Sequence, residues 1–175
     1  SGRAWETVIT SMFLHGGWLH VLANCWFLWV FGNNVEDAMG HLRFLVFYLV
    51  CGLAAAAAQI AVDPSSAVPM VGASGAISGI MGAYIMLYPR VRVHTLVFLL
   101  IFFFRATFPA WAVLGLWFFV QVVNARVEQS GGVAVWAHIG GFVAGAILIW
   151  LFRNPALLAR RAQLLVTRTQ EGFAR

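Results

Sequence analysis

Three groups of polar residues interrupt the apolar segments of this sequence, and they carry the side chains best suited to chemistry. Ser74 and Ser78 lie in one segment, His138 begins another, and His20 with Asn24 lies in a third. A serine hydroxyl needs a neighbouring base to take its proton, and histidine exchanges protons near neutral pH. We therefore expect Ser74 to be a nucleophile and His138 its general base.

Cleavage of an amide passes through a tetrahedral intermediate whose oxyanion needs preorganised hydrogen-bond donors. Residues 72–75 lie at the predicted start of a helix, where free backbone N–H groups and the helix dipole favour negative charge. His20 and Asn24 are four residues apart and share one helix face, so both point towards one site. We expect His20, Asn24 and the Ser74 backbone to contribute to the oxyanion site.

Small residues indicate how the helices that carry Ser74 and His138 approach each other. Gly141 and Gly145 follow His138 at spacings of three and then four residues, which predicts a flat stripe beneath the histidine. A matching glycine stripe follows Ser74. Backbone-to-backbone packing of the two stripes would bring the two helix starts together. The glycines expected to pack at the site are Gly72, Gly75, Gly79, Gly141 and Gly145.

The composition places these helices in a lipid bilayer. The chain has 175 residues, of which 62% are hydrophobic and only 10% are charged, a balance that polar surface could not cover in water. We predict an all-α membrane protein, with residues 1–155 as a single transmembrane domain and residues 156–175 as a cytoplasmic tail. The five expected spans are Trp18–Phe31, Leu42–Val62, Ser74–Tyr88, Pro109–Asn124 and Trp136–Phe152.

Arginines set the expected orientation. The chain has no lysine, and its arginines form no compact cluster, so we expect no nucleic-acid partner. Loops before the first, third and fifth spans contain only Arg3 and Arg126, whereas the remaining nine arginines lie on the opposite side. The positive-inside rule therefore predicts a cytoplasmic C-terminus. With five spans the chain would start outside, so we expect a further helix upstream of Ser1.

The spans are short, which predicts a polar cavity within the membrane. From Ser74 to the end of its span, and from His138 to the end of its own, there are 14 residues, or about 21 Å of helix. The hydrocarbon core is ~30 Å thick. Both residues should therefore lie about 10 Å below the outer surface if the cytoplasmic helix ends are level.

A further apolar segment, Thr95 to Phe104, has ten residues and is too short to cross the membrane. We expect an interfacial or re-entrant piece, because a sixth span here would move His138 to the other side.

A Ser–His dyad is the simplest interpretation of the polar residues. Glu36 and Asp37 fall on the cytoplasmic side and Asp63 falls in an outer loop, so no acid is well placed as a third member. No Asp, Glu or thiolate joins the histidines at metal-ligand spacing. We expect neither a metal nor another cofactor.

Four stretches of the chain resemble one known family. They are HGGWLHVLAN (15–24), FGNNVEDAMGHLRFLVFYLVCG (31–52), VGASGAISG (71–79) and AHIGGFVAG (137–145). The ordered trio HxxxN, GxSG and AHxxG is similar to that of bacterial rhomboid proteases, and the resemblance covers nearly the whole chain. Two features depart from the family: the Trp-Arg pair common in the first loop is absent, and Ser78 stands where an aromatic residue often follows the nucleophile.

The resemblance implies a six-helix core whose first helix precedes Ser1. It implies Ser74 as nucleophile, His138 as base, and His20 with Asn24 at the oxyanion. It also implies cleavage of single-span or multi-span membrane proteins in or beside their transmembrane helices. The expected location is the bacterial cytoplasmic membrane, with the site open to the outer side.

Two other functions fit parts of the pattern. A catalytically inactive relative would bind or escort membrane clients, but such proteins usually lack the serine or the histidine. A transporter or channel subunit would place acidic or paired charges at mid-membrane depth, and the predicted spans contain none.

Overall fold

Helices dominate the computed structural model, which describes residues 4–65, 70–99, 102–127 and 134–173. The predicted helical class is confirmed, with the addition of two strands that the sequence analysis did not predict. In chain order the elements are α1 (Ala4–Ser11), α2 (Trp18–Phe27), a π-helical segment η1 (Leu28–Gly32), α3 (Asn33–Met39), α4 (His41–Val62), α5 (Ser74–Leu87), β1 (Arg92–Leu99), β2 (Phe102–Pro109), α6 (Ala110–Val127), α7 (Val135–Phe152) and α8 (Pro155–Phe173).

Two helices in the described part of the chain, α4 and α7, are long and apolar enough to cross a membrane. The helices Ser74–Leu87 and Ala110–Arg126 are apolar but shorter. The first expected span is divided into α2 and η1, which continue into α3. The exact number of five spans therefore remains a prediction.

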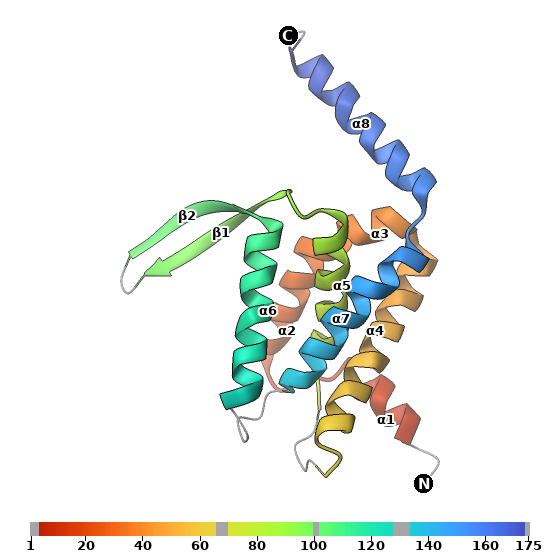
Figure 1. The fold of residues 1–175 in the computed structure, drawn as a ribbon, viewed down its shortest axis with the longest axis vertical. Coiled ribbons are helices and arrows are strands. Elements are labelled where there is room, and N and C mark those ends of the chain that lie inside the picture. Colours follow the sequence, from red (N-terminus) through yellow and green to blue (C-terminus); the bar gives the residue numbers. More distant parts are fainter. Residues whose placement is uncertain (1–3, 66–69, 100–101, 128–133, 174–175) are drawn as a thin grey trace.

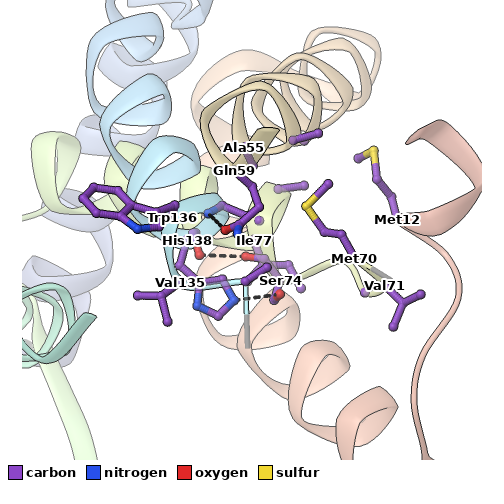
Figure 2. Close-up of a pocket in the computed structure, with 18 of the residues that line it drawn as sticks. Met12, Ala55, Gln59, Met70, Val71, Ser74, Ile77, Val135, Trp136 and His138 are labelled. Carbon is purple, nitrogen blue, oxygen red and sulfur yellow. Dashed lines mark hydrogen bonds between the residues drawn. The ribbon is translucent and has the colours of Figure 1, made fainter. Parts of the chain in front are cut away.

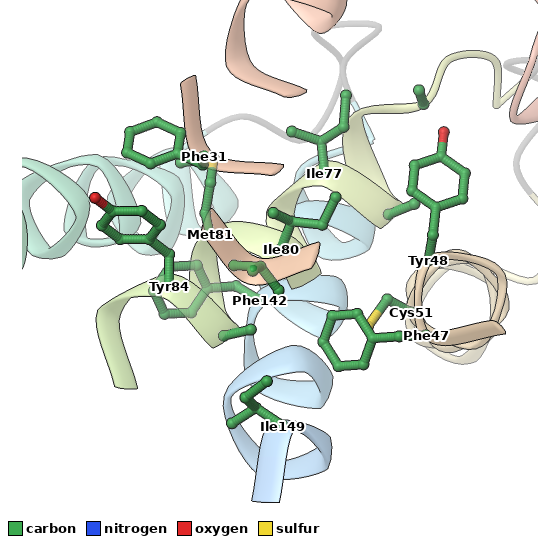
Figure 3. Packing of buried hydrophobic residues seen from close by; sticks show 14 of the residues in the cluster. Phe31, Phe47, Tyr48, Cys51, Ile77, Ile80, Met81, Tyr84, Phe142 and Ile149 are labelled. Carbon is green, nitrogen blue, oxygen red and sulfur yellow. The ribbon is translucent and has the colours of Figure 1, made fainter. Parts of the chain in front are cut away.

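Helix α5 lies at the centre of the bundle, with α2, α4, α6 and α7 around it (Figure 1). Every residue of α5 from Gly75 to Tyr84 is buried. A helix that is apolar on all sides is stable only when it is enclosed, and α5 has that composition. Figure 3 shows its core contacts, in which Ile77, Ile80 and Met81 lie among aromatic and aliphatic side chains of α4, η1 and α7.

The contact between α5 and α7 is made by glycine backbones. A Cβ atom added to Gly141 would collide with the carbonyl oxygen of Gly75, and one added to Gly145 would collide with that of Gly79. On the other side of α5, a Cβ atom at Gly79 would meet the Cys51 side chain of α4. The two stripes thus pack without intervening side chains, and the helix starts that carry Ser74 and His138 are adjacent.

The described residues of the segment Thr95 to Phe104 belong to an antiparallel hairpin. In it β1 and β2 pair from Arg92↔Pro109 to Leu99↔Phe102. A short apolar run rich in leucine and phenylalanine has no periodicity that distinguishes strand from helix, which is why the sequence did not reveal the pairing.

The C-terminal segment forms α8, which projects away from the bundle (Figure 1). The Arg161 guanidinium ties α8 to the bundle by donating to the Asn34 carbonyl at 3.2 Å and to the Tyr88 hydroxyl at 3.3 Å. The division into a domain of residues 1–155 and a tail of residues 156–175 remains a prediction.

The glycine contact generates a test of stability. Gly145→Ala should lower the free energy of unfolding by about 1–3 kcal/mol, because the added methyl group forces α7 away from α5. Gly115→Ala is a matched control, since nothing lies within 4 Å of a Cβ atom there. Helix propensity alone favours alanine in both variants by about 1 kcal/mol. Thermal unfolding in detergent micelles measures the difference, and equal stability of the two variants would contradict backbone-to-backbone packing.

Candidate active site

Ser74 and His138 are joined by a hydrogen bond between the serine Oγ and the histidine Nε2, 2.8 Å apart (Figure 2). Ser74 is the first residue of α5, and His138 lies in the first turn of α7. The two residues are 64 positions apart in the chain. The α5–α7 glycine contact places them together, since both side chains lie just beyond the first glycine pair.

The turn before Ser74 requires glycine. Gly72 has a φ of +116°, in a region that residues with a Cβ atom rarely adopt. Its N–H donates to the Ser11 carbonyl at 2.9 Å, which fixes the turn against the end of α1. The N–H of Ile77 donates to the Ala73 carbonyl at 2.9 Å, so the helical hydrogen bonds begin immediately after the turn. The backbone N–H groups of residues 74–76 therefore precede the first intrahelical donor.

The start of α7 is held by a side chain from α4. The Ala137 N–H donates to the Gln59 side-chain oxygen at 3.2 Å (Figure 2). The same N–H also donates to the Ala134 carbonyl at 3.0 Å, so the Gln59 oxygen is a second acceptor at the helix N-terminus directly beside His138. Gln59 was not identified from the sequence as a site residue, although a polar side chain near the end of an apolar span is a signal for such a role.

The other nitrogen of the imidazole has a partner on α6. The His138 Nδ1–H donates to the Gln121 side-chain oxygen at 3.0 Å. A proton on Nδ1 leaves the Nε2 lone pair to accept the Ser74 hydroxyl, which is the arrangement that a general base requires. The pairing of Gln121 with His138 could not be predicted from the sequence, because it depends on how α6 packs beside α7.

Helix α6 also supplies a ring contact to the histidine. The Trp117 ring lies 5.9 Å from the His138 ring, centroid to centroid, and the two planes are inclined by 45°. Ser78 stands one turn after Ser74, where the family resemblance leads one to expect an aromatic residue. Its hydroxyl is buried and donates to the Ser74 carbonyl at 2.7 Å. Trp117 therefore provides, from another helix, an aromatic neighbour for the base.

His20 and Asn24 lie on α2, and the His20 ring contacts the turn before Ser74. The His20 Nδ1 accepts the Gly16 N–H at 3.4 Å, so the ring carries its proton on Nε2. That ring lies over Gly72, where an added Cβ atom would be 2.8 Å from Nε2. The Asn24 amide is buried and donates one N–H to the His20 carbonyl at 2.8 Å, which leaves its second N–H for another acceptor.

These residues line one cavity of about 1090 Å³. Its walls include Ser74, His138, His20, Asn24 and Trp117. The cavity is large enough for a segment of polypeptide and exposes the hydroxyl, the imidazole and the helix N-terminus to one space. In the described part of the chain, no group of three or more His, Cys, Asp or Glu residues could hold a metal ion.

Fold and site together define a helical membrane protein with a serine–histidine pair at the meeting point of two helix starts. A rhomboid domain matches residues 2–155. The chain therefore belongs to the rhomboid family, as the sequence motifs indicated.

Relatives come from bacteria and plants. The chain is 33% identical over 147 residues to the Rhomboid protease GluP of Bacillus subtilis (strain 168), a match that covers 81% of this chain and 25% of that protein. It is 30% identical over 160 residues to the Rhomboid-like protein 11, chloroplastic, of Arabidopsis thaliana, covering 85% and 52% respectively. It is 32% identical over 147 residues to the RHOMBOID-like protein 5 of the same plant, covering 84% and 43%. The chain spans about half the length of these relatives or less.

The Gln121 contact generates a second prediction. In Gln121→Leu the imidazole loses its Nδ1 acceptor, and a neutral hydrogen bond of about 1 kcal/mol corresponds to roughly a five- to tenfold slower reaction of Ser74 with a fluorophosphonate probe. Gln121→Glu keeps an acceptor oxygen and should recover most of the rate. A purely structural role for Gln121 would instead lower thermal stability in both variants without separating their labelling rates.

Proposed function

We propose that this chain is the catalytic part of an intramembrane serine protease that uses Ser74 and His138 as a dyad. The observation that carries the proposal is the 2.8 Å hydrogen bond between the Ser74 hydroxyl and the His138 Nε2 at the wall of a large cavity. Membership of the rhomboid family and the similarity to a relative named as a protease support the same reaction.

The reaction follows from the proton positions. The Ser74 Oγ attacks the carbonyl carbon of the substrate peptide bond while its proton passes to the His138 Nε2. The imidazolium then donates that proton to the leaving amine nitrogen, the C–N bond breaks, and an acyl-enzyme ester remains on Ser74. In the second half-reaction a water molecule is the nucleophile. His138 takes a proton from the water as its oxygen adds to the ester carbon. The proton then returns to the Ser74 oxygen as the acid product leaves.

The oxyanion formed in each half-reaction would lie at the start of α5. Backbone N–H groups there precede the first intrahelical donor and carry the positive end of the helix dipole. The Nε2–H of His20 faces the same turn, and the second amide N–H of Asn24 is the other side-chain donor. Such donors are fixed before substrate binds, so they stabilise developing charge without reorganisation.

The proposed substrates are single-span or multi-span membrane proteins, cut in or near their transmembrane segments. The proposed location is a bacterial cytoplasmic membrane, with the site open to the outer side and the C-terminus in the cytoplasm. The arginine distribution supports this orientation. A lipid bilayer is then both the solvent of the enzyme and the source of its substrates.

The dyad is tested by removing either member. Ser74→Ala and His138→Ala should each lower cleavage of a single-span substrate in proteoliposomes by at least about 10³-fold, because neither half of an activated nucleophile works alone. Ser78→Ala is a matched control on the same helix, and it should remain within a few-fold of the parent. Thermal unfolding must show all three variants folded. Cleavage by Ser74→Ala at the parent rate would overturn the proposal, whereas absence of cleavage by the parent protein itself would favour an inactive client-binding relative.

The oxyanion donors are tested separately. His20→Ala should reduce kcat by about 10²–10³ with little change in KM, because the lost donor acts on charge that develops only in the transition state. His41→Ala, at the opposite end of the bundle, is the control and should leave kcat unchanged. A change confined to KM would assign His20 to substrate binding instead.

A further inference from the structure

The β1–β2 hairpin is a surface that the proposed catalysis does not use. It extends outward beyond α6 and runs across, not along, the axes of the bundle helices (Figure 1). Its base is fixed, because the Ala110 N–H donates to the Val91 carbonyl at 2.8 Å and the Trp111 N–H donates to the Pro89 carbonyl at 3.0 Å. The hairpin therefore leaves the bundle at the level where α5 ends and α6 begins.

The register divides the hairpin into two unlike faces. Directly paired residues share a face, and successive residues alternate between faces. The first, here called the apolar face, contains the pairs Val93↔Phe108, Thr95↔Ala106 and Val97↔Phe104, followed by Phe102. The second, here called the basic face, contains Arg92, the pair His94↔Thr107 and the pair Leu96↔Arg105, followed by Phe103.

Four phenylalanines among the described residues of the hairpin are exposed. Phe102 is 69% exposed, Phe104 is 51% exposed and Phe108 is 43% exposed on the apolar face. Phe103 near the tip of the basic face is 72% exposed. A two-stranded hairpin is marginally stable in water, and contiguous exposed aromatic groups of this kind mark a contact surface. This surface requires an apolar environment on one side.

The charged residues of the hairpin indicate which kind of surface supplies this apolar environment. Arg92 and Arg105 lie on the basic face, Arg90 precedes β1, and the sequence has no acidic residue between Asp63 and Glu128. Each arginine near an anionic leaflet adds to the electrostatic attraction between the hairpin and that leaflet. An element that is apolar on one face, carries arginines beside Leu96 and Phe103 on the other, and runs across the spans fits the boundary between acyl chains and headgroups.

We infer that the β1–β2 hairpin is a membrane-binding arm, which lies in the plane of an anionic phospholipid surface with its apolar face towards the acyl chains. The positive-inside rule assigns this end of the bundle to the cytoplasmic leaflet. We expect lipid, and not a soluble protein, to cover the apolar face. The reason is that the arm leaves the bundle at the level where the membrane-embedded helix α5 ends and α6 begins. The inference does not depend on protease activity.

Depth-dependent fluorescence quenching tests the arm in the full chain. The parent carries Cys25→Ser, and Cys51 is fully buried and stays unlabelled. A fluorophore is attached to Phe104→Cys on the apolar face or to Thr107→Cys on the basic face of the same strand. The protein is reconstituted into vesicles of phosphatidylcholine with or without phosphatidylglycerol. Nitroxides on the lipid acyl chains should quench the probe at position 104 roughly twofold more than the probe at position 107.

Two further measurements decide whether lipid covers the apolar face of the hairpin. Phosphatidylglycerol should increase acyl-chain quenching at position 104, and Arg92→Gln combined with Arg105→Gln should abolish that increase. Equal quenching of both positions by aqueous iodide, with none by lipid nitroxides, would overturn the inference. Protection of position 104 from iodide that disappears when the protein is diluted in excess lipid would also overturn the inference. That result would assign the apolar face to a contact with a second copy of the chain.

Discussion

The site depends on how closely two helix backbones can approach inside a membrane. Hydrophobic association is weak between helices surrounded by lipid, so packing contacts must hold them together. Gly141 and Gly145 of α7 lie against the backbone carbonyl groups of Gly75 and Gly79 of α5, with no room for a Cβ atom. This contact sets the separation of the two helix starts. The hydrogen bond between Ser74 and His138 is a consequence of it, since any larger side chain in the stripe would move one group away from the other.

His138 and the start of its helix are held by neighbours from other helices. Gln59 of α4 accepts the Ala137 N–H, and Gln121 of α6 accepts the Nδ1–H of His138. In an apolar environment an unsatisfied donor is costly, so each such bond limits the positions that the helices can occupy. His138 is thus oriented by three elements at once: α7 carries it, α4 contacts the start of its helix, and α6 fixes its tautomer.

Much of this arrangement could be predicted from the sequence, because it depends on residue spacing and composition within single segments. Glycine spacing after Ser74 and His138 predicts which helix faces meet, and apolar length predicts a membrane protein. The partners of Gln59 and Gln121 could not be predicted, because a single polar residue in an apolar span indicates a role without naming its neighbour. The strands were missed because a run such as residues 95–104 satisfies strand and buried helix equally well.

Helix α6 connects the proposed membrane-binding arm with His138. It begins at the hairpin, at Ala110, and it carries Gln121 eleven residues later, about 16 Å along its axis. A tilt of ~5° about Ala110 would displace Gln121 by more than about 1 Å, which is enough to lengthen its 3.0 Å bond to His138 beyond hydrogen-bonding range. An arm seated in the headgroup region would hold the start of α6 at a fixed depth and limit that tilt. The orientation of the imidazole then depends on the bilayer as well as on the bundle.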